Sequence, residues 1–219
     1  MIMKDIIDLM PVPVLHKNIG NFINCDDISI LKSAELKTMR PISSILCEAS
    51  NEYIMNEINK WTNYFAHNII GIEEHLSIET NEVLLIKTPP GNQLSMHDHP
   101  NSILSAVYYF EDAPESSPLV LYIEQQNIFK KFDFLVGYQK TNRYNESYYE
   151  IHPKKGDLVI FPSWIPHFNP TNMTEQPRYS LASQTWLRGN IPSTTKTRWE
   201  RYSRAVRVSG EYYAPDLEM

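Results

Sequence analysis

The chain has 219 residues, of which 42% are hydrophobic and 21% are charged, so it suits one globular domain and its composition argues against disorder. Its formal net charge is −6, and no cluster of lysines and arginines stands out, which disfavours nucleic acid as a partner. No run of about 18 apolar residues occurs, so we expect neither a membrane-spanning helix nor a membrane partner.

The two cysteines, Cys25 and Cys47, are too few for a disulfide framework, and their spacing matches no metal motif. The first residues do not resemble a signal peptide, because an acidic residue comes early and no small-residue cleavage site follows. We therefore expect a cytoplasmic location, in the host cell if the chain is viral.

The first part of the chain predicts an extended segment and then a helix. Prolines favour extended geometry within residues 1–25. A helix is then expected through ILKSAELKTMR as far as Pro41, with Asp26 or Asp27 as its cap.

A second, longer helical pattern opens at Ser43 or Ser44 and ends near Gly71. Apolar residues recur in it at roughly helical spacing: Leu46, Ile54, Ile58, Trp61 and Phe65. We expect this apolar side to pack on the core of the protein.

After Glu74 the chain changes to short β-rich runs separated by turn signals. The runs are NEVLLIKT, SILSAVYYF, LVLYI, YYEIHP, DLVIFPSW and YSLASQTWL. Such strands after a helical segment indicate a closed or sandwiched antiparallel β unit. We expect a single domain over residues 1–219, made of an N-terminal extension with helices, a β core and a C-terminal extension: 1–74, 75–190 and 191–219.

Three of the seven histidines stand out by their context. His97 and His99 lie in SMHDHPNSILSAVYYF, where the chain enters a strand, and residues i and i+2 of a strand project to the same face. His167 follows another expected strand, in DLVIFPSWIPHFNP. Three nitrogen ligands meeting on one face would leave positions open for substrate and oxygen, as in the facial triad of non-haem iron enzymes.

Arg178 and Ser180 predict an anion site. They also share a strand face, and a guanidinium pointing into a β-barrel is costly to bury unless it meets an anion. A carboxylate held bidentately by the arginine, with the hydroxyl beside it, meets this demand.

The ordered set His97-x-His99, His167 and Arg178-x-Ser180 resembles the His-x-Asp/Glu…His…Arg-x-Ser pattern of 2-oxoglutarate/Fe(II) dioxygenases, and most closely their prolyl-4-hydroxylase-like branch. More narrowly, HDHPNSILSAVYYF with GDLVIFPSWIPHFNP is similar to segments of a group of 2-oxoglutarate oxygenases from bacteria and tailed phages.

This resemblance covers about residues 80 to 190 and implies a mostly β fold, a double-stranded β-helix (jelly roll, cupin-like) core with flanking N-terminal helices. It also implies that His97 and His167 bind Fe(II), and that Arg178 with Ser180 holds the distal carboxylate of 2-oxoglutarate. The implied reaction consumes O2 and 2-oxoglutarate, with ascorbate as a candidate reductant, and hydroxylates a peptidyl or small-molecule substrate. The resemblance names no catalytic residue beyond the metal ligands.

The third metal ligand is open. The superfamily has Asp or Glu where this chain has His99, and the neighbouring carboxylate, Asp98, would reach the metal only through a bulge or loop, because adjacent strand residues face opposite ways. We favour His99, with Asp98 or a water beside two histidines as alternatives. A histidine in place of the carboxylate also leaves two rival hypotheses open: a three-histidine cupin-like enzyme that does not use 2-oxoglutarate, and a non-catalytic jelly-roll binding module.

Four other residues are candidates for the pocket: Asn101, Ser102, Tyr109 and Trp164. The aromatic pair could line the core or the cavity, and the polar pair could face the pocket or only shape the turn after Pro100. The N-terminal helices and the C-terminal extension are expected to frame substrate access or a contact between copies in a homo-oligomer.

Overall fold

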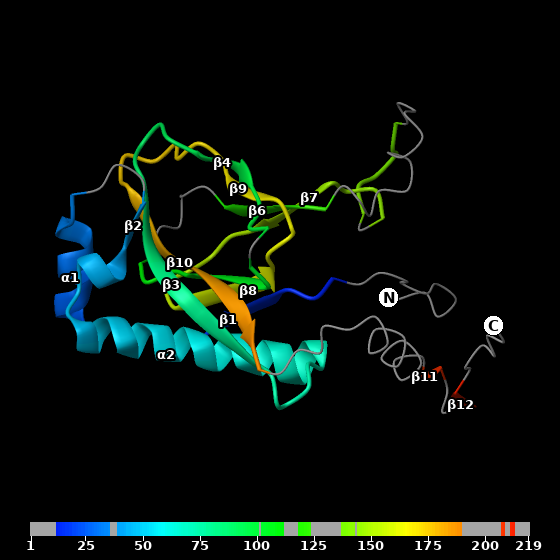
Figure 1. Ribbon diagram of the computed structural model, residues 1–219. Coiled ribbons are helices and arrows are strands. Elements are labelled where there is room, and N and C mark those ends of the chain that lie inside the picture. Colours follow the sequence, from blue (N-terminus) through cyan, green and yellow to red (C-terminus); the bar gives the residue numbers. More distant parts are fainter. Residues whose placement is uncertain are drawn as a thin grey trace.

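The computed structural model describes residues 12–35, 39–100, 102–111, 118–123, 137–142, 144–189, 207–208 and 211–212. Within them, two antiparallel sheets face one another, and the helices cover the outer face of the larger sheet (Figure 1). This arrangement confirms the expected mostly β, double-stranded β-helix core with N-terminal flanking helices. No helix in the described ranges is both long and apolar enough to cross a membrane.

The larger sheet has six strands, all paired antiparallel. In spatial order they are β1 (Leu15–Asn18), β8 (Asp157–Pro162), β5 (Leu104–Tyr108), β10 (Arg178–Arg188), β3 (Ser77–Thr88) and β2 (Met39–Pro41). β10 is therefore a central strand, and its whole length pairs with β3.

The smaller sheet has four strands, in the order β4 (Leu94–His97), β9 (His167–Asn169), β6 (Leu119–Tyr122) and β7 (Tyr148–Ile151). Two very short strands near the C-terminus, β11 (Arg207–Val208) and β12 (Glu211–Tyr212), pair with each other. The other residues of the expected C-terminal extension lie outside the described part.

The six β-rich runs of the sequence correspond to β3, β5, β6, β7, β8 and β10, so these expectations are confirmed. Side chains alternate between the two faces of each strand. On β5, Leu104, Ala106 and Tyr108 belong to the core beneath the helices, while Val107 packs toward the smaller sheet. The larger sheet is thus buried on both faces, and its inner face can line a cavity.

The first helix, α1 (Cys25–Ser33), is shorter than expected. The backbone becomes extended at Ala34, and Met39–Pro41 forms β2 at the edge of the larger sheet instead of continuing the helix. An edge strand tolerates Pro41 because proline has no N–H to donate to a neighbouring strand. The cap is also different: Asn24 accepts a 2.8 Å hydrogen bond from the Asp27 N–H.

The second helical pattern is confirmed as a short 3₁₀ turn, η1 (Ile42–Ser44), followed by α2 (Glu48–Tyr64) and a π-helical turn, η2 (Phe65–Ile70). Gly71 ends it in the left-handed conformation at φ 80°, which glycine adopts without strain. The apolar side of α2 is buried against the larger sheet through Ile54 and Ile58.

Candidate metal and anion site

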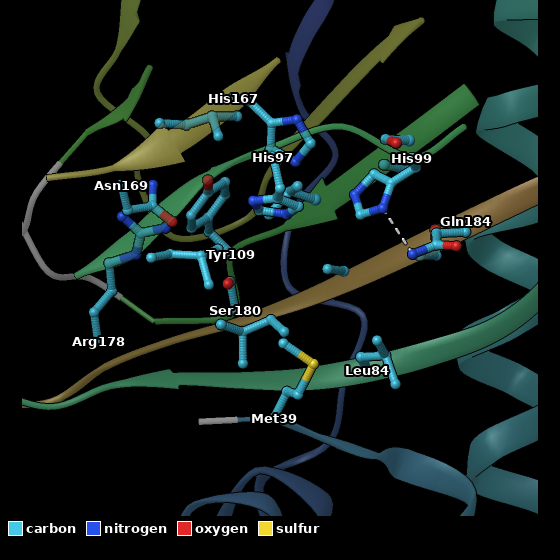
Figure 2. A pocket seen from close by; sticks show the side chains of 18 residues that line it. Met39, Leu84, His97, His99, Tyr109, His167, Asn169, Arg178, Ser180 and Gln184 are labelled. Carbon is cyan, nitrogen blue, oxygen red and sulfur yellow. Dashed lines mark hydrogen bonds between the residues drawn. The ribbon is translucent and has the colours of Figure 1, made fainter. Parts of the chain in front are cut away.

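A cavity of about 170 Å³ opens between the two sheets, on the inner face of the larger one. β10 contributes a row of alternate residues to it, in the order Arg178, Ser180, Ala182 and Gln184. Figure 2 shows Arg178 on one side of the cavity, Gln184 on the other, and the three expected histidines above this row.

His97, His99 and His167 lie together at this cavity. One nitrogen of each ring lies within 4.8 Å of those of the other two rings. The ring centroids are 5.1 Å apart for His97 and His99, 4.4 Å for His97 and His167, and 5.0 Å for His99 and His167. Three imidazoles this close could hold one transition metal ion.

The way in which His99 reaches the cluster differs from the expectation. His97 ends β4 and lies directly opposite His167, the first residue of β9. His99, however, follows β4 in a loop and is not on the same strand. Its N–H donates to the Ser163 carbonyl at 3.0 Å, and this bond ties the loop to the segment after β8. The three histidines do lie together, but not because His97 and His99 alternate along one strand.

The rings of His97 and His167 are oriented by backbone carbonyls. Nδ1 of His97 lies 2.7 Å from the Ser95 carbonyl oxygen, and Nδ1 of His167 lies 3.0 Å from that of Ile165. Because a carbonyl can only accept, each Nδ1 carries the proton and each Nε2 keeps its lone pair. This is the arrangement that a metal-ligating histidine requires.

Burial favours the neutral form of two of these histidines, His167 and His99. It lowers the pKa of His167 to about 4, and the neighbouring His97 and His99 add to this effect. Burial also lowers the pKa of His99, again with a contribution from His97. Metal ligation needs neutral imidazole, so the donor set fits a divalent transition metal.

Asp98 does not share this position. It is exposed and does not line the cavity, in contrast to the histidines on either side of it. Of the alternatives for a third ligand from the chain, the geometry therefore supports His99.

The opposite side of the cavity is lined by a guanidinium and two hydroxyls. Arg178, Ser180 and Tyr109 line it and are 3%, 2% and 3% exposed. The guanidinium carbon of Arg178 lies 5.3 Å from the centroid of the Tyr109 ring. Burial raises the pKa of Tyr109, although the charge of Arg178 opposes this effect, so the phenol stays protonated. Within the described structure its hydroxyl is buried without a hydrogen-bond partner, which leaves it able to donate to a ligand.

Several cavity residues were not anticipated, and Asn169 and Gln184 are two of them. Asn169 lies two residues after His167 on β9, and Gln184 lies four residues after Ser180 on β10. The period-two rule that pairs Arg178 with Ser180 also places both of these side chains on the cavity face, so it could have identified them.

The other pocket candidates have different outcomes. Tyr109 lines the cavity as expected, and Asn101 lies outside the described residues. Ser102 and Trp164 do not line it. The Ser102 hydroxyl is bonded to the Leu104 carbonyl at 3.0 Å, so it shapes the loop, and the Trp164 side chain points to solvent, with 54% of the residue exposed.

Comparison with known proteins agrees with this site. Residues 83–184, which carry all three histidines, Arg178 and Ser180, match a family described as "Putative 2OG-Fe(II) oxygenase", where 2OG stands for 2-oxoglutarate. Among curated proteins no match was found.

Solved structures share the fold at low sequence identity. A prolyl-4-hydroxylase from Pseudomonas putida is 17% identical, with a TM-score of 0.51 over 81% of this chain and 94% of that one. HygX from Streptomyces hygroscopicus, solved with nickel, 2-oxoglutarate and hygromycin B, is 10% identical, with a TM-score of 0.50 over 80% and 82%.

An oxidoreductase of the 2OG-Fe(II) oxygenase family from Burkholderia pseudomallei is 14% identical, with a TM-score of 0.46. The match covers 64% of this chain and 58% of that protein. The matched segment, which holds the three histidines, Arg178 and Ser180, is similar to the 2OG-Fe(II) oxygenase family, and the chain shares the fold of the prolyl-4-hydroxylase from Pseudomonas putida.

Proposed function

We propose that this protein is a 2-oxoglutarate- and Fe(II)-dependent hydroxylase whose substrate presents an uncharged C–H group, either on a peptidyl side chain or on a small molecule. The observation that carries this proposal is the presence of both a three-histidine cluster and a buried arginine in one cavity. Each feature would serve one component of the reaction.

The metal would be held by His97, His167 and His99. When bound, Fe(II) supplies the oxidation in which R–H, O2 and 2-oxoglutarate become R–OH, succinate and CO2. The contribution of the chain is to present three neutral nitrogens and to orient their rings. The carbonyls of Ser95 and Ile165 do this for two of the rings.

The cosubstrate would be anchored by Arg178, Ser180 and Tyr109. The Arg178 guanidinium is buried at the cavity, and a carboxylate can accept two parallel, charge-assisted hydrogen bonds from it. The hydroxyls of Ser180 and Tyr109 can add further bonds to the same carboxylate. Binding of nickel and 2-oxoglutarate by HygX supports this use of the shared fold.

The substrate group would lie beside the aliphatic flank of the cavity. Met39 on β2, with Leu84 and Ile86 on β3, forms this flank, and Figure 2 shows Met39 and Leu84 across the cavity from the histidines. Among the described lining residues, only Arg178 carries a charge at neutral pH. The aliphatic flank favours an apolar, uncharged substrate group beside it.

The direct test is turnover. Purified protein is supplied with Fe(II), ascorbate, O2 and 2-oxoglutarate, and succinate is measured with and without a panel of peptides and small molecules. We expect slow succinate formation without substrate, faster formation with an accepted one, and none in His167→Ala. If no substrate gives succinate and 2-oxoglutarate does not bind, the proposal is wrong.

One specific observation favours a second candidate, a three-histidine enzyme that does not use 2-oxoglutarate: the acidic ligand of the superfamily pattern is replaced by His99. Such an enzyme has no need of Arg178 as an anchor, so Arg178→Ala would leave its turnover intact. The remaining rival, a non-catalytic binding module, predicts that the purified protein contains no transition metal.

A further inference from the structure

The third histidine has a different kind of partner from the other two. Nδ1 of His99 lies 2.8 Å from Nε2 of Gln184, the amide nitrogen of a half-buried side chain on β10 (Figure 2). The Nδ1 atoms of His97 and His167 instead lie against carbonyl oxygens. A single side chain amide therefore determines the state of the His99 ring.

The chemistry of this contact decides which nitrogen carries the proton. In this orientation of the amide its N–H donates to Nδ1 of His99, and a neutral ring then carries its proton on Nε2. Nε2 is the nitrogen left for a metal, and Figure 2 shows it on the side of His97. In this tautomer His99 has no lone pair to offer there, whereas His97 and His167 do.

The glutamine can also support the opposite tautomer. If its amide turns over, the oxygen Oε1 comes to face Nδ1, accepts a proton from it and leaves Nε2 free to bind. The His99 backbone stays fixed meanwhile, because its N–H remains bonded to the Ser163 carbonyl. The turn of one amide thus converts a two-histidine site into a three-histidine site.

We propose that Gln184 is the positioning residue of the metal site, and that rotation of its amide switches His99 between a non-ligating and a ligating tautomer. The inference rests on the proposed metal site but does not depend on the use of 2-oxoglutarate. The sequence leaves open whether the ligands are three histidines or two histidines with water. In this proposal these two ligand sets are two states of one site.

Three variants test the role of the amide. Gln184→Met fills a similar volume without an acceptor, and Gln184→Glu offers an acceptor only. Gln139→Glu makes the same chemical change at an exposed residue that does not line the cavity. In Co(II) titrations we expect Gln184→Met to weaken binding by about 10- to 100-fold. We expect Gln184→Glu to bind at least as tightly as wild type, and Gln139→Glu to be unchanged.

A carboxylate would also attract the metal through its charge, so the deciding measurement is the tautomer itself. Long-range ¹H–¹⁵N NMR of ¹⁵N-histidine-labelled protein distinguishes the two forms. We expect the His99 proton on Nε2 in the metal-free wild type, and on Nδ1 after Zn(II) loading. Gln184→Glu should show the Nδ1–H form before any metal is added.

The outcomes separate this inference from the proposed function. Wild type that binds no Co(II) would overturn both. Wild type that binds Co(II), with equal affinity in Gln184→Met and an unchanged His99 tautomer in Gln184→Glu, would overturn the role of Gln184 alone.

Discussion

The buried imidazole of His167 makes the stability of the protein depend on pH. Its pKa is lowered from 6.5 to about 4, first of all by burial. Below pH 6.5 the unfolded chain binds a proton there that the folded protein does not, so folding stability falls as the pH drops toward 4. We expect the metal-free protein to lose about 2 kcal/mol between pH 7 and pH 5 from this group alone. Urea unfolding at the two pH values measures the loss.

A matched pair of variants identifies the group responsible. His167→Gln should remove most of this pH dependence, whereas His152→Gln should not, because the side chain of His152 is 69% exposed. Equal pH dependence in wild type and His167→Gln would contradict the assignment.

Arg178 is expected to control affinity for 2-oxoglutarate and not for the metal. In protein loaded with Ni(II), Arg178→Ala should weaken 2-oxoglutarate binding roughly 100-fold, since a charge-assisted pair is lost. Arg178→Lys keeps the charge but not the bidentate geometry, so its affinity for 2-oxoglutarate should lie between those of wild type and Arg178→Ala. Calorimetry gives both constants, and a Ni(II) titration of each variant provides the control. Unchanged 2-oxoglutarate binding in Arg178→Ala would show that the anion lies elsewhere.

At the scale of residues, the sequence was sufficient to predict the groups that meet in the cavity but not what orients them. His97, His167, Arg178 and Ser180 could be found because strand ends and strand alternation place them. The partner of His99 could not, because it depends on a 2.8 Å contact between residues 85 positions apart.

Among the elements, β1 is joined to β8 both by backbone pairing and by one side chain, Asp157. The Asp157 carboxylate accepts a hydrogen bond from Asn18 at 2.9 Å and from the Lys154 N–H at 2.8 Å, and it lies 2.9 Å from Nε2 of His16. Burial alone would raise the pKa of Asp157, but these bonds outweigh it and lower the pKa. Asp157 thus ties β1 to the edge of β8.

Loss of this carboxylate should release β1. We expect Asp157→Ala to destabilise the protein by about 2 kcal/mol, because hydrogen bonds to a buried, charged acceptor are lost. Chemical denaturation measures this, and hydrogen exchange should show faster exchange in residues 15–18 than in β10. Exposed Asp98→Ala is the control, with no expected change in stability. A stable Asp157→Ala with protected β1 would mean that backbone pairing alone holds the strand.

Prediction of elements succeeded where the patterns were long. The six β-rich runs became strands because alternation over several residues is hard to mistake. β2, β4 and β9 were missed, and β1 was expected only as part of an extended segment, because each of them pairs with a strand far along the chain. The end of α1 was misplaced for the same reason: pairing of Met39–Pro41 with β3 overrides local helix propensity.

For the molecule as a whole, the order of elements along the chain, helices and then strands, predicted the fold class. It did not predict the order of the strands within each sheet. β1 and β8 are neighbours although they lie about 140 residues apart in the chain, as the His16–Asp157 contact illustrates. In the smaller sheet, pairing of β4 with β9 sets His167 opposite His97, while Arg178 lies on β10 of the larger, facing sheet.

We propose that one cavity binds a metal through three histidines and 2-oxoglutarate through Arg178, with the metal as part of the cosubstrate site. The most direct test is calorimetric titration of 2-oxoglutarate into the same protein with Ni(II) and after removal of all metal. We predict binding with Ni(II), a large loss of affinity without it, and a similar loss in His97→Ala supplied with Ni(II). Binding that is equally tight with and without metal, or no binding to the Ni(II)-loaded protein, would contradict the claim.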